Sequence, residues 1–158
     1  MQMAISPQDI LTLGIAALIN ILITIMFCKS LTKTLSYVDP ENKAIQPVMI
    51  WMLLIPGLNY LLNFFVVFGM TKSISNELES RNFEEVNRPA FTSGIIFATL
   101  SLLAAITLFV PIPKSLAVAA GVVGFAQIFF FIQYWMKINW YKAILKQDEE
   151  GASSDDET

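Results

Sequence analysis

Four long runs without a charged residue alternate with polar segments along this chain. Each run holds 19 or more residues, and together they cover residues 10–28, 48–70, 91–112 and 116–136. A helix needs about 20 apolar residues to cross the roughly 30 Å hydrocarbon core of a bilayer. These runs are apolar on every face, whereas a helix on the surface of a soluble domain keeps a polar face. The pattern predicts an all-α integral membrane bundle of four transmembrane helices, at about residues 7–28, 48–70, 90–110 and 115–136.

The first run opens with a helix start signal. Ser6 can accept a hydrogen bond from a free backbone N–H, Pro7 suits the first helical position, and Asp9 complements the positive end of the helix dipole. The segment before this run has no lysine or arginine, so we expect a retained span rather than a signal peptide. Prolines also stand just before the other three runs, at Pro47, Pro89 and Pro113.

The second run differs from the others because it carries a proline and two amides in its interior. Pro56 cannot donate a backbone hydrogen bond to Met52, so it predicts a kink with a free carbonyl group. Asn59 and Asn63 follow, four residues apart and therefore on one face of a helix. Two further amides that we single out lie in the first and fourth runs, at Asn20 and Gln127.

Two interpretations of these polar residues remain open. They can line an intramembrane site for a substrate, an ion or a lipid headgroup, formed by Asn20, Pro56, Asn59, Asn63 and Gln127. Alternatively, the amides bond to neighbouring helices, an interaction that contributes on average about 0.6 kcal/mol inside a membrane. We favour the second interpretation, because interhelical hydrogen bonds of this kind are a usual role for such residues in spans.

Small residues predict where the helices approach one another closely. Lipid tails are as apolar as leucine, so membrane helices associate through close packing and hydrogen bonds, and small side chains permit both. The third and fourth runs carry such residues at steps of three or four. We expect the two helices to pack through Gly94, Ala98, Ala117, Ala120, Gly121 and Gly124. The same residues can instead form the contact between two copies of the chain.

Charged segments after the second and fourth runs predict cytoplasmic helical extensions. Residues 71–88 contain acid–base pairs at the helical i, i+4 spacing, Glu77–Arg81 and Glu84–Arg88. After the fourth run, lysines alternate with aromatic residues, as in a helix that lies at the headgroup layer. The predicted interfacial anchors are Trp51, Tyr134, Trp135, Trp140 and Tyr141.

The chain is expected to divide into a membrane domain, residues 1–146, and a disordered acidic tail, residues 147–158. The tail holds six of the 13 acidic residues and no basic one. Segments of this composition bury too little apolar surface to stay folded. The net charge of −3 therefore comes from the tail, and the rest of the chain is mildly basic.

The distribution of basic residues predicts an orientation. With four crossings and both termini in the cytoplasm, six basic residues lie inside: Lys72, Arg81, Arg88, Lys137, Lys142 and Lys146. Four lie outside: Lys29, Lys33, Lys43 and Lys114. Lysine and arginine concentrate in the cytoplasmic loops of membrane proteins. The six-to-four ratio thus favours a multi-pass protein with both termini cytoplasmic.

The sequence lacks the residues that several classes of catalysis and binding need. Hydrophobic residues make up 55% of the 158 residues, and charged residues make up only 15%. There is no histidine, no Asp, Glu, Lys or Arg within the four uncharged runs, and no HExxH, CxxC, GxSxG or phosphate-loop motif. We therefore expect no enzyme activity, no metal or cofactor, and no nucleic-acid partner. The single cysteine, Cys28, is interpreted as structural.

Residues 47–81 resemble a segment of a protein family. The resemblance is carried by the pattern WxLLIPxxN from Trp51 to Asn59, by NFFVV from Asn63, and by Ser73, Ile74, Glu77 and Arg81. The segment is similar to one in small multi-spanning bacterial membrane proteins, including ones from Bacteroidota, which have no established activity. The resemblance implies a bacterial inner membrane and no specific activity.

Together these patterns predict a non-enzymatic integral membrane protein. We expect a structural, accessory or partner-binding subunit that contacts membrane lipids and either a second copy or another membrane protein. The alternative is a small transport or ligand- or lipid-binding membrane protein, with a polar site at the kink. The two hypotheses differ at Asn59 and Asn63. The first expects neighbouring helices to satisfy these amides, and the second expects a water-accessible cavity at their depth.

Overall fold

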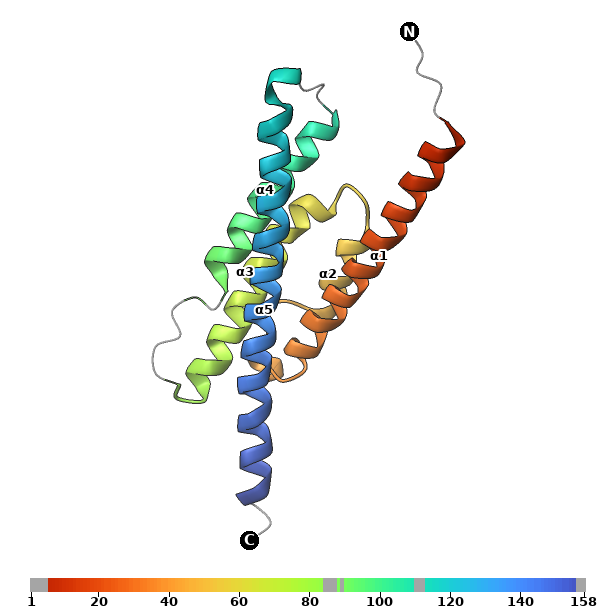
Figure 1. Cartoon of the computed structure of the whole chain (residues 1–158). Helices are drawn as coiled ribbons and strands as arrows, with labels where there is room; N and C mark the ends of the chain where they lie inside the picture. Colours follow the sequence, from red (N-terminus) through yellow and green to blue (C-terminus); the bar gives the residue numbers. More distant parts are fainter. Residues whose placement is uncertain (1–5, 84–87, 89, 110–112, 156–158) are drawn as a thin grey trace.

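The protein is built from helices joined by short connections (Figure 1). The computed structural model describes residues 6–83, 88, 90–109 and 113–155, and these residues form no strand. The all-α class predicted from the sequence is confirmed. In chain order the elements are α1 (Pro7–Leu35), η1 (Pro40–Asn42), α2 (Pro47–Trp51), η2 (Met52–Leu54), α3 (Asn59–Ser80), α4 (Phe91–Phe109), η3 (Lys114–Leu116) and α5 (Ala117–Asp155).

The start of α1 confirms the predicted cap. Ser6 Oγ accepts a hydrogen bond from the Asp9 N–H at 3.2 Å, and Asp9 Oδ2 accepts one from the Ser6 N–H at 3.0 Å. This reciprocal capping box satisfies two backbone donors that have no partner within the helix, and Pro7 occupies the first helical turn. The helix then continues about two turns past residue 28, its predicted end, to Leu35.

The second predicted helix is interrupted at Pro56–Gly57. The chain runs from α2 into η2, reverses direction, and continues as α3. Gly57 has φ = +87°, the conformation that the second central residue of a type II turn requires. The Met52 carbonyl, which a kinked helix would leave free, accepts a bond from the Ile55 N–H at 3.0 Å. A single kinked helix over residues 48–70 is therefore wrong, and a helical hairpin takes its place.

This hairpin comprises residues 47–80, and its first arm continues the connection that follows α1. Along this connection the Asp39 N–H lies 2.8 Å from Glu77 Oε2. Further on, the Ile45 side chain covers Gly69, where a Cβ atom would come within 2.6 Å of Ile45 Cβ. As residue numbers rise along this connection, those of its partners on α3 fall. The connection, and the first arm that continues it, therefore run antiparallel to α3.

Helix α4 packs against both α3 and α5, and it is antiparallel to α5 (Figure 1). Gly94 allows the close approach, because a Cβ atom there would lie 2.6 Å from Val67 Cγ1 and 2.8 Å from Tyr134 Cε2. Ala98, one turn further, is fully buried. The small residues of α4 thus do lie at a helix interface, and that interface joins α4 to α3 as well as to α5.

The buried core occupies only part of the molecule. Its largest members come from the end of α1, from α2, from α3 and from the middle and later turns of α5: Leu31, Leu35, Ile50, Met70, Ile74, Leu78, Tyr134, Ile138 and Leu145. By contrast, every residue from 7 to 23 of α1 is exposed, although most of them are apolar. Two helices are long and apolar enough to cross a membrane, α1 and α5 over Ala117–Glu150, and α4 contains a shorter apolar stretch, Phe91–Thr107.

The start of α1 and the end of α5 lie at opposite ends of the molecule (Figure 1). Four crossings would instead return the chain to the side on which it began. Helix α5 also continues to Asp155, through residues that composition predicts to be disordered. The segment from Gln147 to Glu150 contains good helix formers, and its Asp148 is ion-paired. Residues 156–158 of the predicted tail lie outside the described part of the chain.

Candidate functional site

Three of the five predicted polar residues line a small pocket at the turn of the hairpin. The pocket has a volume of about 160 Å³, and we call it the turn pocket. Its lining includes Asn20 and Thr24 from α1 and Pro56, Gly57, Asn59 and Tyr60 from the hairpin. A water molecule in the liquid takes about 30 Å³, so the pocket has room for a few waters or a small ion. Drug-sized ligands occupy larger sites, of about 300–1,000 Å³.

The turn pocket contains polar groups of two kinds. Asn59 Oδ1 is buried and has no hydrogen-bond partner among the described residues. A buried acceptor without a partner costs about 1–3 kcal/mol, so a bound donor or cation would offset this cost. Thr24 Oγ1, in contrast, already donates to the Asn20 carbonyl at 2.9 Å. A small ligand that reached this oxygen would have to donate a hydrogen bond or carry positive charge.

The other two predicted site residues lie elsewhere. Asn63 is half-buried on α3 and does not line the turn pocket. Gln127 Nε2 donates to Ser101 Oγ at 3.2 Å, which joins α5 to α4. Gln127 thus has the structural role that we favoured for the amides, whereas Asn20 and Asn59 meet at a cavity. The structure does not bring all five residues together.

The predicted packing residues of α5 have open space around them. A Cβ atom at Gly121 or Gly124 would meet nothing within 4 Å, apart from the helix itself. Ala117 is exposed and Ala120 is half-buried. Larger side chains of later turns of α5 contact α4, among them Gln127 and Tyr134. Among the described residues, Gly121 and Gly124 therefore make no close helix contact of the kind Gly94 makes.

The five aromatic residues predicted as interfacial anchors have different environments. Tyr134 is fully buried, with its ring centroid 6.1 Å from that of Phe27 and 6.4 Å from that of Phe97. Trp51 and Trp140 are exposed, as an anchor requires. Trp135 and Tyr141 are half-buried. Tyr134 therefore belongs to the core, because its ring packs against Phe27 of α1 and Phe97 of α4.

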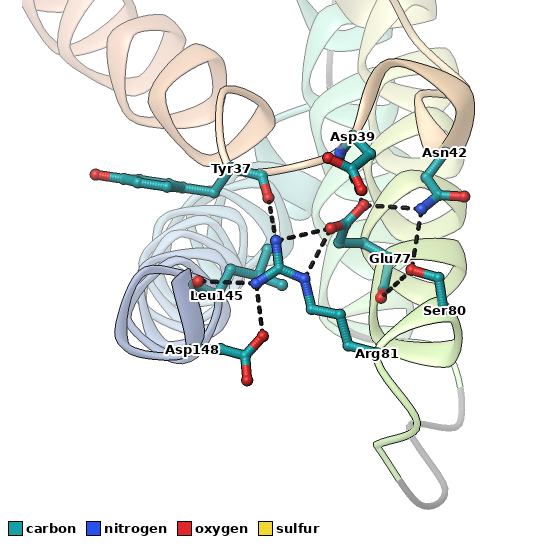
Figure 2. Close-up of polar contacts among 8 residues, drawn as sticks. All are labelled: Tyr37, Asp39, Asn42, Glu77, Ser80, Arg81, Leu145 and Asp148. Atoms are coloured by element: carbon teal, nitrogen blue, oxygen red, sulfur yellow. Dashed lines mark hydrogen bonds and ion pairs between the residues drawn. The ribbon is translucent and has the colours of Figure 1, made fainter. Parts of the chain in front are cut away.

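A second polar assembly lies at the end of the molecule where α1 ends (Figure 2). The Arg81 guanidinium is its centre: Nη1 lies 2.8 Å from Asp148 Oδ2, and Nη2 lies 2.8 Å from Glu77 Oε1. The same group donates to two backbone carbonyl groups at 3.1 Å, those of Tyr37 and Leu145. We call the residues of Figure 2 the Arg81 cluster. One side chain thus links α3 to the end of α1 and to α5.

Glu77 is fully buried within the Arg81 cluster. Besides Arg81, its carboxylate accepts bonds from Asn42 Nδ2 at 2.9 Å and from the Asp39 N–H at 2.8 Å. Burial alone would raise the pKa of Glu77, but these hydrogen bonds and the Arg81 charge outweigh it and hold the pKa below its ordinary value. A buried carboxylate whose two oxygens are both engaged is unsuited to proton transfer with a substrate. The cluster is a structural clamp.

Only part of the Arg81 cluster has a signal in the sequence. The i, i+4 spacing predicted the Glu77–Arg81 pair, which the structure confirms at 2.8 Å. Glu84, of the second predicted pair, lies outside the described residues. Asp148 was assigned to the tail by composition, and the two carbonyl acceptors of Arg81 belong to the backbone, which carries no residue-type signal. The turn pocket did have a signal, because a Pro-Gly dipeptide is typical of a turn.

Comparison of the chain with protein-family models, with curated proteins and with solved structures finds no match. The resemblance of residues 47–81 to small bacterial membrane proteins therefore stays a prediction. Across the described ranges, no group of three His, Cys, Asp or Glu side chains is placed to hold a metal ion. The features that remain for assigning a function are the hairpin, the turn pocket and the distribution of charged and apolar surface.

Proposed function

We propose that this chain is an integral membrane protein with three crossing helices and one re-entrant hairpin, and that it acts without catalysis as a partner-binding subunit. Helices α1, α4 and α5 cross the bilayer. The hairpin enters from one side, turns at Gly57 and leaves on the same side. The observation that carries this topology is the 2.8 Å contact between the Asp39 N–H and Glu77 Oε2. The segments before and after the hairpin can meet only on one side of the membrane.

The depth of the hairpin supports this topology. At the base of its first arm, Cys28 Sγ of α1 lies 3.3 Å from the Ile50 carbonyl oxygen. At its turn, Gly57 lines the same pocket as Asn20. A helix rises 1.5 Å per residue, so these two levels of α1 are about 12 Å apart. This distance is less than half of a roughly 30 Å hydrocarbon core, so the hairpin reaches close to the midplane.

The same topology places positive charge almost entirely on one side. Lys114, in η3 between α4 and α5, is alone at its end, and the other nine of the ten basic residues belong to the opposite end. The earlier four-crossing assignment divided them six to four. By the positive-inside rule, the Arg81 cluster and the end of α5 are cytoplasmic and the start of α1 is outside. The resemblance of residues 47–81 favours a bacterial inner membrane.

A partner-binding role is supported by surface that lipid covers poorly. Residues 55–58 of the turn are exposed and are not helical, although they lie at membrane depth in this topology. Hydrocarbon cannot hydrogen-bond to irregular backbone, which is tolerated in membranes only where protein or a water-filled cavity covers it. Gly14, Gly121 and Gly124 also have open space, and small residues are enriched where membrane helices meet. A second copy or another membrane protein would cover this surface.

Labelling of single cysteines tests the topology. In a Cys28→Ala background, Gln8→Cys, Glu41→Cys and Glu79→Cys place exposed thiols before α1, before the hairpin and near the end of α3. With a membrane-impermeant reagent on intact cells, we expect Gln8→Cys to react and the other two to react only after lysis. Four crossings predict that Glu41→Cys lies opposite both other sites. Labelling of Glu41→Cys and Glu79→Cys on different sides of the membrane would reject the re-entrant hairpin.

Energy transfer between labelled copies in vesicles tests the subunit role. Gly121→Leu and Gly124→Leu should reduce association of the chain with its partner but leave its melting temperature unchanged, because both positions face open space. Val118→Leu and Val122→Leu, exposed on the same helix, are matched controls. Association of the pure protein identifies a second copy as the partner, and cross-linking in native membranes tests for another protein. Glycine variants that behave like the valine variants in both assays would contradict the role.

The turn pocket supports a second candidate function, binding or transport of a small polar ligand. The observation that favours it is the buried, unpartnered Oδ1 of Asn59 at a cavity that Asn20 also lines. Cysteine at Asn20 or Asn59, in the Cys28→Ala background, should react with an impermeant thiol reagent if water fills the pocket. Asn63→Cys, outside the pocket, is the control. Reaction at neither Asn20 nor Asn59 would reject the transport function.

A further inference from the structure

A groove of about 680 Å³ runs beside α3, between the connection that precedes α2 and the start of α4. We call it the α3 groove. It shares no residue with the turn pocket or the Arg81 cluster. Ile45 and Met49 line it on one side and Phe91 on another, and Gly69 is part of its wall on α3. Its volume lies within the range of small-molecule sites, about 300–1,000 Å³.

The groove changes from apolar to polar along α3. Phe65, Phe68, Lys72 and Asn76 follow at steps of three or four residues, so they share one face of the helix. The two phenylalanine side chains are 61% and 54% exposed and belong to the uncharged run that ends at residue 70. Lys72 stands just beyond that run, about 10 Å along the helix from Phe65. The apolar part of the groove is therefore at membrane depth, and the polar part is at the cytoplasmic boundary.

Among the described residues, two cations and no carboxylate line the α3 groove. Lys72 and Arg88 are both exposed, and neither has an ion pair within the described ranges. The Arg88 guanidinium carbon lies 5.6 Å from the centroid of the Phe91 ring. This stacking holds the planar group at the groove and leaves its N–H donors available. The lining thus favours a negatively charged group at the polar end.

We propose that the α3 groove binds a membrane phospholipid with an anionic headgroup. An acyl chain lies along Met49, Phe65 and Phe68, and the phosphate lies between Lys72 and Arg88. Arginine suits this position because its parallel N–H groups match phosphate oxygens, while lysine contributes a point charge. A soluble anion would leave the exposed phenylalanine rings uncovered, and a neutral acyl chain would leave the two cations unused. The amphipathic ligand uses both.

This inference rests on the membrane location proposed above, and its test is separate from the topology test. The full chain is extracted in mild detergent from vesicles of equal parts phosphatidylglycerol and phosphatidylcholine, and retained lipid is identified by native mass spectrometry. We expect retained phosphatidylglycerol in preference to phosphatidylcholine. Lys72→Gln and Arg88→Gln should each reduce that retention about tenfold, because each removes a charge-assisted hydrogen bond. Both side chains are exposed, so the melting temperature should not change.

Matched variants separate a built site from general attraction of basic residues to anionic lipid. Lys29→Gln and Lys137→Gln remove exposed lysines at the same end of the molecule but outside the groove, and should leave retention unchanged. Phe65→Ala should weaken retention while all charges remain. Inorganic phosphate in large excess should not displace the lipid, since it lacks the acyl chain.

Three results would overturn the proposal, even with the three-crossing topology established by labelling. The first is equal loss of phosphatidylglycerol in the Lys29→Gln and Lys72→Gln variants, which would mean attraction by surface charge alone. The second is full displacement by inorganic phosphate, which would mean a site for a soluble anion. The third is equal retention of phosphatidylcholine, which would mean that the two cations of the groove do not select a headgroup.

Discussion

Arg81 Nη1 lies 2.8 Å from Asp148 Oδ2, although 67 positions separate the two residues in the chain. The other terminal nitrogen of the same guanidinium lies 2.8 Å from Glu77 and 3.1 Å from the Tyr37 carbonyl oxygen. Because Glu77 is fully buried and Asp148 is 43% exposed, the two ion pairs of Arg81 differ in their surroundings. The buried one, with Glu77, should contribute more to stability.

Arg81→Gln should lower the free energy of unfolding by about 3 kcal/mol, because removal of one partner of a buried ion pair leaves the other charge uncompensated. The hydrogen bonds from Asn42 and Asp39 to the Glu77 carboxylate remain in this variant. They still stabilise part of the buried charge, and so they limit the loss of unfolding free energy. Asp148→Asn is the matched control and should cost less than about 1 kcal/mol, as exposed pairs do. Thermal unfolding in detergent measures both variants. Equal losses of unfolding free energy in the two variants would show that the Arg81–Glu77 ion pair is not stronger than the Arg81–Asp148 pair.

The Arg81 cluster should also make the fold sensitive to acid. The pKa of Glu77 is held below its ordinary value, so between the folded and unfolded pKa values the folded state binds fewer protons. The stabilisation is therefore fully present above the unfolded carboxyl pKa, about 4.3, and is lost as pH falls through the lower folded value. The melting temperature should drop below about pH 4. Glu77→Gln should be less stable at neutral pH and should show a smaller acid-induced drop.

An acid-induced drop of the same size in the Glu77→Gln variant would assign the sensitivity to other carboxylates. Asp9 provides an internal comparison, since its carboxylate accepts hydrogen bonds from the Ser6 hydroxyl and the Ser6 N–H at the exposed start of α1. Asp9→Asn removes a capping interaction but none of the clamp. We therefore expect this variant to keep most of the acid-induced drop in melting temperature.

Local features of the fold could be predicted from the sequence, because the residues that determine them are adjacent in the chain. Ser6, Pro7 and Asp9 specify the start of α1 through bonds within a single turn. The Glu77–Arg81 pair follows from helical spacing alone. The length and uniform apolarity of the runs likewise predicted helices. Each of these inferences needs only one element and no knowledge of its neighbours.

The hairpin could not be predicted, because its decisive contacts join distant residues. A run of 23 apolar residues has the length of one crossing, and composition does not distinguish it from two half-crossings. Pro56–Gly57 was interpreted as a kink although the pair is also a turn signal. The contact between Asp39 and Glu77 decides between the two, and it depends on tertiary packing. Whether Pro56–Gly57 forms a kink or a turn determines both the membrane topology and the residues that line the turn pocket.

Gly94→Ala should destabilise the protein by about 1–3 kcal/mol, because an added methyl group must displace well-packed neighbours. Its Cβ atom would lie 2.6 Å from a branched methyl group of Val67 and 2.8 Å from the Tyr134 ring, neither of which is the end of a flexible chain. Gly121→Ala and Gly124→Ala, which meet nothing within 4 Å, are controls and should be neutral or slightly stabilising. Melting temperatures in detergent compare the three. A neutral Gly94→Ala variant would contradict the close packing of α4.

Gly57→Ala should destabilise the hairpin by about 1–2 kcal/mol, the cost of a left-handed backbone conformation for a residue with a Cβ atom. Gly57 has φ = +87°, and a Cβ atom there would meet nothing within 4 Å, so the loss reports backbone strain rather than a steric clash. Gly57→Asn should lose less, because asparagine tolerates this conformation better than alanine does. Gly14→Ala, in a helical and open position, should be neutral or stabilising. If Gly57→Ala matched Gly14→Ala in melting temperature, residues 55–58 would not form the turn on which the re-entrant topology depends.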